Sequence, residues 1–407
     1  SNIQICRDLH PPSLAIPEPH NKPRTTRLSK KNNKKLIVTP SQIMVLLRQL
    51  RRAKAAGNDL ESLDIFIKMA TTHARCRKKN STTFVKPNTL ASFFSQIIQG
   101  DLPPRISKIF RTTYLVALRK CEVDPTRLRP LNIPAALRRI STKVILHLYR
   151  TRFAKHLLPF NYAFGVNGGM DFIISTVRLG VEKYITKRQN NGLLPTRVLL
   201  SIDIKNMFNS VSRQKLRHIV GEDFPDLLPF VDMLYANKGQ SMVKLEDGTW
   251  ETIDVEEGFS QGCPLSPVFA GIVLNHILRR LDRLMMQRAE DRQRQCLQQG
   301  LSSDDNQGGI PIVMGYMDDI NALVHTKDAA FFMHHFKRLG LPLGAILNQE
   351  KTRVMTSTNG QKLTDLLCES TDPGLKSTGE DLLQMIQENS TKDGAPQEIT
   401  DGIRVLG

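Results

Sequence analysis

The sequence predicts an α+β fold built on an antiparallel sheet. Residues 197–203 (RVLLSID) form a short, apolar, β-prone run, as expected of a buried strand. Residues 241–255 and 312–325 each hold two β-prone runs joined by a turn, which is the pattern of a hairpin. Apolar residues recur at helical spacing in other segments. One predicted helix begins at Thr39, and others cover residues 62–73, 90–99, 134–153, 264–281 and 380–389.

The chain carries a large excess of positive charge: 57 Lys and Arg residues against 39 Asp and Glu residues, a formal net charge of +18. Such an excess indicates a polyanionic partner. Nucleic acid fits better than a membrane surface, because no basic amphipathic helix with an aromatic face is visible. No apolar run approaches the ~20 residues that span a bilayer, so we expect no membrane partner.

The start of the chain and its cysteines indicate the compartment. Nothing in the first residues resembles a secretory signal, and the six cysteines are scattered without a CxxC pair, which argues against a zinc site and a disulfide framework. We therefore expect free thiols and an intracellular protein, nuclear or cytoplasmic and not secreted. Because the chain does not begin with Met, we expect a fragment or a processed product.

The strongest chemical signal is a pair of adjacent acids, Asp318 and Asp319, in the sequence YMDD of the second predicted hairpin. Adjacent carboxylates repel one another and Asp is unfavourable inside strands, so a bound cation would relieve the penalty. A third acid, Asp203, ends the predicted strand and would converge on this pair if the strand lies beside the hairpin. Hard divalent cations prefer such oxygen ligands, and two-metal phosphoryl transfer needs such a cluster. The alternative is an ordinary exposed Asp-Asp turn.

An ordered set of motifs accompanies these acids and resembles the reverse transcriptase family, especially its non-LTR retrotransposon and group II intron branch. The motifs are RPLNIP (129–134), FGVNGG (164–169), SIDIKNMFNSV (201–211), GFSQGCPLSP (258–267), YMDD (316–319) and LNQEKT (347–352). YxDD alone is a weak signal, whereas the ordered set is specific. The resemblance covers most of the chain, from about Lys54 onward.

The resemblance implies a right-hand polymerase with helical fingers and an antiparallel-sheet palm. Residues 1–37 would then be a basic disordered tail, 38–196 the fingers, and 197–362 the palm with a flexible insertion at 287–309. Residues 363–407 would be a polar segment leading to a truncated primer-grip region, with the thumb absent from this fragment.

The resemblance also implies where the chemistry takes place. Asp203, Asp318 and Asp319 would bind two Mg²⁺ (or Mn²⁺) ions, with the backbone carbonyl of Ile204 as a further ligand. Lys351 falls where the family has a lysine near the leaving pyrophosphate, able to act as an acid or an electrostatic stabiliser. A solvated surface lysine is the alternative for Lys351.

Further residues would bind the nucleotide. Phe208 stands where the family places a bulky side chain under the sugar, which would exclude a ribose 2′-hydroxyl; an ordinary core phenylalanine is the alternative. Gln261 and Gly262 begin the segment along the incoming nucleotide, where a glycine permits close backbone approach. Cations of the fingers would hold the triphosphate, and guanidinium groups suit bidentate phosphate contact. The candidates are Lys120, Arg129 and Arg139.

The implied reaction is RNA-templated transfer of a nucleotide from a dNTP to a primer 3′-hydroxyl by a retroelement enzyme. Its partners would be template RNA, nascent DNA and dNTPs, while the oligomeric state is not determined. Two alternatives stay open: a decayed or co-opted element product that binds RNA without polymerising, and an RNA-directed RNA polymerase. Viral forms of the latter carry a ribose-reading Asp near the position of Phe208. Asn209 departs from the branch, in which many relatives have a second Asp.

Overall fold

The computed structural model describes residues 36–50, 64–69, 86–119, 128–245, 247–298, 311–348, 351–356, 362–371, 373–387 and 397–399, together with Gln4, Arg7 and Asp8. The described chain combines helices with mostly antiparallel strands, so the predicted α+β class is confirmed. Within these residues no helix is both long and apolar enough to cross a membrane. The described cysteines, Cys263, Cys296 and Cys368, are free thiols, as expected.

The chain folds into two compact units that are not contiguous in sequence. The first unit comprises Ser1–Arg150 and Phe208–Phe269, and the second comprises Thr151–Met207 and Ala270–Gly407. The expected boundary at residue 196 falls inside the second unit. The chain therefore passes between the units three times.

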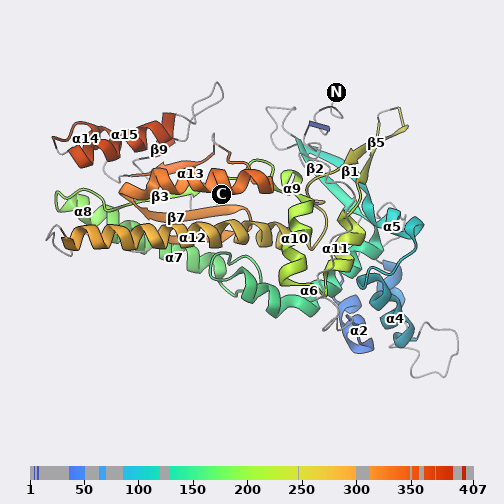
Figure 1. The fold of residues 1–407 in the computed structure, drawn as a ribbon. Coiled ribbons are helices and arrows are strands. Elements are labelled where there is room, and N and C mark those ends of the chain that lie inside the picture. The colour runs from blue at the N-terminus through green and yellow to red at the C-terminus, as the bar shows by residue number, and fades with distance from the viewer. Residues whose placement is uncertain are drawn as a thin grey trace. The chain divides into compact units, whose positions relative to one another are not determined.

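A four-stranded sheet in the order β2-β1-β4-β5 organises the first unit (Figure 1). β1 (Thr112–Arg119) pairs with β2 (Leu128–Pro134) in antiparallel fashion, and β4 (Gly239–Lys244) and β5 (Trp250–Val255) form the first predicted hairpin. β1 and β4 run in parallel, which joins segments far apart in the sequence.

The two faces of this sheet differ in exposure. Alternate side chains such as Leu115 and Asn132 are buried, whereas Val116 and Trp250 on the other face are 41% and 50% exposed. On the exposed face the rings of Tyr114 and Trp250 stack with their centroids 5.1 Å apart. The sheet thus has one face in the core and one face open.

Helices account for most of the remaining first unit. They are α2 (Pro40–Arg48), α4 (Pro87–Ile98), α5 (Pro104–Arg111), α9 (Met207–Ser210, shared with the second unit), α10 (Arg213–Asp223) and α11 (Leu228–Tyr235), with the first part of α6 (Ala136–Leu157). Thr39 caps α2: its hydroxyl accepts the N–H of Gln42, whose side chain in turn accepts the N–H of Thr39. The predicted helix start at Thr39 is therefore confirmed, as are the helices expected near α4 and α6.

The second unit is built on a five-stranded sheet in the order β6-β7-β3-β8-β9. Its strands are β3 (Arg197–Ile202), β6 (Ile312–Tyr316), β7 (Asp319–His325), β8 (Arg353–Met355) and β9 (Gln397–Ile399). All neighbours are antiparallel except β8 and β9. The predicted strand at 197–203 and the predicted hairpin at 312–325 are confirmed and lie side by side.

Helices cover this sheet. They are α7 (Gly169–Val181), which continues through the π-helix η2 (Glu182–Thr186) into α8 (Lys187–Asn190), and α13 (Ala329–Gly340), α14 (Leu363–Cys368) and α15 (Pro373–Gln387). The α7 residues Ile173 and Val177 pack with Leu199, Leu323 and Met355 of three different strands in one buried cluster. Burial of these side chains ties the three strands together.

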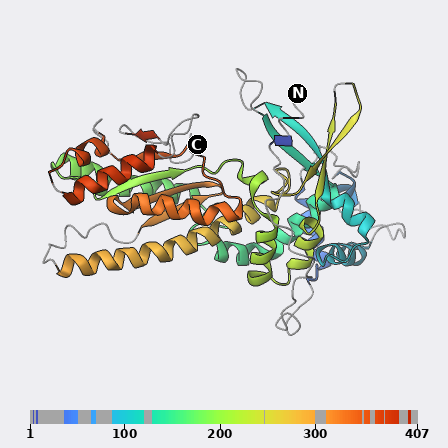
Figure 2. The same cartoon turned by 45° about the horizontal axis from the view of Figure 1, so that its top comes forward.

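Helix α12 (Ser266–Gln298) is one unbroken helix (Figure 2), and it corrects part of the expected insertion. The prediction of a flexible segment at 287–309 is wrong for residues 287–298, which are helical; residues 299–309 lie outside the described part of the chain. Arg, Gln and Glu are strong helix formers, and Arg294 pairs with Glu290 and Asp291 one turn earlier. A polar composition was therefore mistaken for irregular structure.

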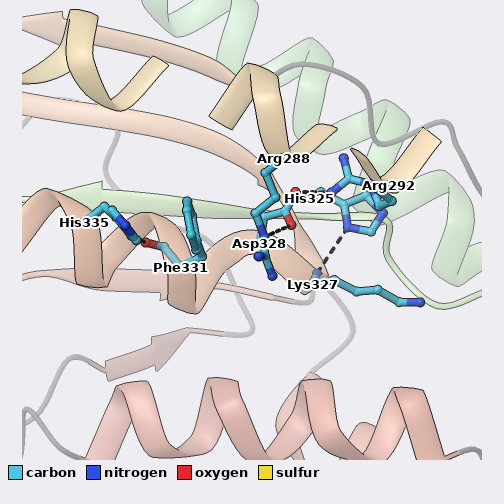
Figure 3. A network of polar contacts seen from close by, with 7 residues as sticks. All are labelled: Arg288, Arg292, His325, Lys327, Asp328, Phe331 and His335. Carbon is cyan, nitrogen blue, oxygen red and sulfur yellow. Dashed lines mark hydrogen bonds and ion pairs between the residues drawn. The ribbon is translucent and has the colours of Figure 1, made fainter. Parts of the chain in front are cut away.

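Two arginines fix the far part of α12 to the turn after β7 (Figure 3). The Nε of Arg288 donates to Asp328 at 2.8 Å, and Arg292 pairs with the same carboxylate, whose side chain is 5% exposed. Burial and repulsion by Arg292 lower the pKa of His325 to about 3. The ring is therefore neutral, and its Nδ1 accepts the N–H of Lys327 at 3.2 Å.

Candidate active site

One end of the sheet in the second unit gathers the three predicted acids. β3 ends at Ile202, so Asp203 is the first residue beyond the strand, while Asp318 and Asp319 form the turn and first residue of β7. β3 and β7 are adjacent and antiparallel, with Ile202 opposite Ile320. Continuing that register places Asp203 opposite Asp319 on the same face of the sheet.

The position of Asp203 is fixed by Asn348. The side-chain amide of Asn348 donates to Oδ2 of Asp203 at 2.6 Å, and its backbone N–H donates to the carbonyl of Asp203 at 2.9 Å. One residue thus holds both the main chain and the carboxylate of Asp203. A charge-assisted hydrogen bond of this length restricts the carboxylate to one orientation.

The backbone at the hairpin turn is unusual. Met317 has a positive φ of 57°, a conformation that favours glycine, at the first position of a two-residue turn closed by Tyr316 and Asp319. The buried side chain of Asn161 donates to the carbonyl of Met317 at 3.0 Å, and Asn161 also bridges to Gly315. These contacts hold the turn in the shape that presents Asp318 and Asp319.

Several negatively charged side chains lie close together at this end of the sheet. Burial raises the pKa of Asp319, and the negative charges of Asp318 and Asp203 raise it further, whereas Lys351 opposes the shift. The structure therefore brings Asp203, Asp318 and Lys351 within electrostatic reach of Asp319. Lys351 is exposed, so its ammonium can approach a solvent-side ligand.

The carbonyl of Ile204 faces the same side of the strand as the hairpin. Hydrogen bonds from Asn348 to Asp203 and from Lys205 to Ile346 flank the bridge between Ile204 and Leu347. In such an antiparallel pair the residue between two bonds turns its own N–H and C=O away from that partner. Because β3 lies between β8 and β7, the carbonyl of Ile204 points away from the segment of Leu347 and toward the side of β7.

The donor set suits hard divalent cations. Carboxylate oxygens are the ligands that Mg²⁺ and Mn²⁺ prefer, and the raised pKa of Asp319 reports repulsion that a cation would remove. Among the described residues, however, no three Asp, Glu, His or Cys side chains form a ready-made metal-binding cluster. The strand register nevertheless places the three acids at the same end of the sheet.

The first unit contains the predicted nucleotide-binding segments. Phe208, in α9, is half-buried, and its carbonyl accepts the N–H of Phe259. Next to it, Gly258 has φ 72°, and an added Cβ there would meet the backbone of Asn209 at 2.4 Å. The segments carrying Phe208 and Gln261 are therefore in direct backbone contact.

Gly262 is required by a close approach within the protein itself. Its N–H donates to the carbonyl of Asn132 at 3.1 Å, and an added Cβ would lie 2.1 Å from that oxygen. The expected close approach at Gly262 is therefore made to strand β2. Gln261, beside it, is half-buried.

The three predicted phosphate-binding cations have different surroundings. Arg129 is exposed on β2, on the open face of the sheet, because it alternates with the buried Leu128 and Pro130. Arg139 is only 9% exposed within α6, which does not favour phosphate contact in this conformation. Lys120 lies outside the described residues.

Two site residues were not singled out by sequence reasoning. Asn348 lies inside the LNQEKT motif (347–352), so its position was visible but its role was not. Asn161 has no motif around it, and only the parallel bridge to Gly315 reveals its function. Both act through contacts between segments distant in sequence.

These features together define a class of protein, the nucleic acid polymerases whose carboxylates sit at the end of a mostly antiparallel sheet. A sequence model of the family described as "Reverse transcriptase (RNA-dependent DNA polymerase)" matches residues 119–402, well over half of the chain. The chain belongs to the reverse transcriptase family.

Several solved telomerases are similar to this chain. The apo telomerase of Candida tropicalis truncated from its C-terminal domain is 14% identical, with a TM-score of 0.41, and the match covers 62% of this chain and 51% of the other. The same organism's telomerase with a TWJ fragment of telomeric RNA is 14% identical, with a TM-score of 0.43 over 62% and 42%. The Candida albicans complex is 12% identical, with a TM-score of 0.38 over 64% and 45%. This chain thus spans about half the length of these telomerases, and the TM-scores are too low to define its fold.

Proposed function

We propose that this chain catalyses RNA-templated DNA synthesis, transferring a nucleotide from a dNTP to the 3′-hydroxyl of a primer. The observation that carries the proposal is the placement of Asp203, Asp318 and Asp319 together at one sheet end in a chain of the reverse transcriptase family. Template RNA, nascent DNA and dNTPs are the proposed partners. The quoted motifs favour a retroelement enzyme of the non-LTR or group II intron branch.

In this proposal the three acids and the carbonyl of Ile204 hold two Mg²⁺ or Mn²⁺ ions. Such ions, when bound, activate the attacking hydroxyl and neutralise the triphosphate and the leaving pyrophosphate. Asn348 keeps the carboxylate of Asp203 oriented, since it donates to Oδ2 at 2.6 Å. Lys351, exposed beside Asp319, stabilises or protonates the leaving group.

The first unit supplies substrate selection in this proposal. Phe208 bars the ribose 2′-hydroxyl, Gln261 and Gly262 lie along the nucleotide, and Arg129 contacts the triphosphate from the open sheet face. Arg129 is the preferred cation because its guanidinium is exposed, whereas that of Arg139 is buried. Because Phe208 would exclude ribonucleotides in this way, it favours DNA synthesis over RNA synthesis.

The decisive experiment is primer extension on an RNA template by the wild-type protein and by Asp318→Asn. We expect extension by the wild type with Mg²⁺ or Mn²⁺, and none by the variant. RNA affinity should stay nearly unchanged, because the substitution alters the net charge of +18 by a single unit.

Asp171→Asn is a matched control, because Asp171 is an exposed acid on α7 of the same unit and its replacement changes the charge equally. It should extend primers at the wild-type rate. Extension by Asp318→Asn at that rate would contradict the assignment of the acids. Tight RNA binding without any extension by the wild type would instead favour a co-opted RNA-binding protein.

A further inference from the structure

Three guanidinium groups gather on the buried side of the sheet in the first unit. Arg111, Arg138 and Arg213 line one small cavity, together with the hydroxyls of Thr113 and Ser241. Arg138 and Arg213 are only 2% and 6% exposed. Like charges at such depth need compensation, because burial removes them from water.

The hydrogen bonds that these arginines make go to neutral groups. Arg138 donates to the carbonyl of Phe110 at 2.8 Å and to the hydroxyl of Tyr235 at 3.2 Å. Burial by itself would lower the pKa of Arg138, but the neighbouring thiol of Cys263 and hydroxyl of Tyr235 raise it above its ordinary value. Arg213 donates from Nε to the carbonyl of Gly258 at 2.8 Å and from a terminal nitrogen to that of Val255 at 2.7 Å.

The third arginine follows the same pattern. Arg111 donates to the carbonyl of Met233 at 3.2 Å. These contacts satisfy N–H groups of the three arginines, but their carbonyl and hydroxyl acceptors carry no negative charge that would neutralise the guanidinium groups.

No carboxylate is among the residues that line the cavity. Glu257 accepts the backbone N–H of Arg213 at 2.7 Å, but it lies outside the lining. Burial lowers the pKa of Arg213 to about 10, and repulsion by Arg138 acts in the same direction, whereas Tyr235, Glu257 and Glu256 oppose the shift. Two buried guanidinium groups thus lie near one buried carboxylate, that of Glu257.

One N–H group of these arginines also lacks a hydrogen-bond acceptor. The Nε of the fully buried Arg138 has no hydrogen-bond partner among the described residues. A buried N–H without an acceptor is uncommon and indicates an acceptor that occupies the adjoining space. The cavity supplies that space, because Arg138 lines it.

The size of the cavity limits the acceptor. It has room for one small, monatomic particle and is too small for a phosphate group. We propose that this cavity binds a small monovalent anion, of the size and charge of chloride, between Arg138, Arg213 and Arg111. Arg111 is only half-buried, which gives the ion a route from solvent.

This anion site faces away from Arg129, although Ser260, which lines the cavity, directly precedes Gln261 in the chain. Asn132 lines the cavity, and Arg129 lies on the opposite face of the same strand, because the two positions differ by an odd number of residues. The inference therefore does not depend on the proposed polymerase reaction. It concerns what holds the core of the first unit together.

The first test compares melting temperatures in sodium chloride and sodium gluconate at equal ionic strength. Chloride should raise the wild-type value by roughly 1–2 °C for each tenfold increase above its dissociation constant, because the ion binds only the folded state. Arg138→Met should lose this chloride dependence. Equal melting temperatures of the wild type in the two salts would overturn the proposal.

Arg217→Met is the matched control, because Arg217 belongs to the same unit but is paired with Asp232 at 2.6 Å and partly exposed. It should keep the full chloride dependence, whereas a general salt effect would act on both variants alike and would refute the site. If Arg138→Met does not fold, Arg111→Met serves in its place, because Arg111 lines the cavity but is only half-buried, and this variant too should lose the chloride dependence.

The second test uses only the wild-type protein. Crystals grown or soaked in bromide should show an anomalous peak in this cavity, within contact of Arg138 and Arg213. A water molecule at that position, with no anomalous signal at any bromide concentration, would overturn the proposal.

Discussion

The two units of this protein gather charges of opposite sign, and the two clusters differ in how far their side chains are exposed to solvent. The second unit brings together Asp203, Asp318 and Asp319 at a sheet end where the acids are half-exposed and Lys351 reaches solvent. The first unit gathers the almost fully buried Arg138 and Arg213 and the half-buried Arg111 around one small cavity. Both clusters repel internally and so call for a counterion. The acidic cluster is open to solvent, whereas the basic one lies mostly in the core of its unit.

Removing a charge from the acidic cluster should have the largest effect. Asp319→Asn should reduce primer extension by at least ~1,000-fold, about 4 kcal/mol of barrier, because it removes a proposed metal ligand. The variant should nevertheless be more stable than the wild type in EDTA at neutral pH, since it relieves repulsion by Asp318 and Asp203.

The pH dependence follows from the raised pKa of Asp319. The folded protein holds the proton of the Asp319 carboxyl more tightly than the unfolded chain does. The stability that this proton contributes is therefore complete below the ordinary pKa of Asp, and it is lost as the pH rises through the pKa of Asp319 in the folded protein. The melting-temperature gap between Asp319→Asn and the wild type should therefore open as pH rises from acidic to neutral, and Mg²⁺ should close it. A gap that is independent of both pH and Mg²⁺ would contradict the electrostatic account.

A change in the first unit should alter selection rather than abolish chemistry. Phe208→Ala should raise the ratio of rNTP to dNTP incorporation, by up to ~100-fold, since misplacement of a substrate by about 1 Å can cost that much in rate. Competitive primer extension with the two nucleotides measures the ratio. Phe93→Ala is the control, because Phe93 is a 39%-exposed phenylalanine of the same unit.

If Phe208 is only a core residue, both substrates should suffer together. Truncation would then lower stability by ~3–5 kcal/mol without changing the ratio. An unchanged ratio with a lowered melting temperature would remove the reason to prefer DNA over RNA synthesis.

The smallest expected effect tests the backbone of the first unit. Gly262→Ala should destabilise the protein by about 1–3 kcal/mol, because the new Cβ would meet the carbonyl oxygen of Asn132 at 2.1 Å. Gly221→Ala is the control, since its Cβ would find only Leu228 at an ordinary 3.5 Å in a helix. Denaturant unfolding measures the stability of both variants. If Gly262→Ala were as stable as the wild type, strand β2 would be able to move aside at this point without cost.

Sequence reasoning predicted the elements that have a local signal. The apolar run at 197–203, the hairpins and the capped helix at Thr39 were all visible, because alternation, turn residues and caps act over a few positions. Strand β1 and helices α7, α10, α11 and α13 were missed, although they lie between predicted elements. Residues 287–298 were misread, because a helix without a wide apolar face lacks the periodic signal.

The sequence by itself determined which acids, glycines and motifs this reverse transcriptase family member carries, and that its sheet is mostly antiparallel. The tertiary structure alone decided that Asp203 stands opposite Asp319, that Asn348 and Asn161 hold the two acidic segments, and that Gly262 meets strand β2. It also gathered Arg111, Arg138 and Arg213 around one cavity. Pairings of this kind join positions far apart in the chain, and the free energy of each depends on burial and register that no local pattern encodes.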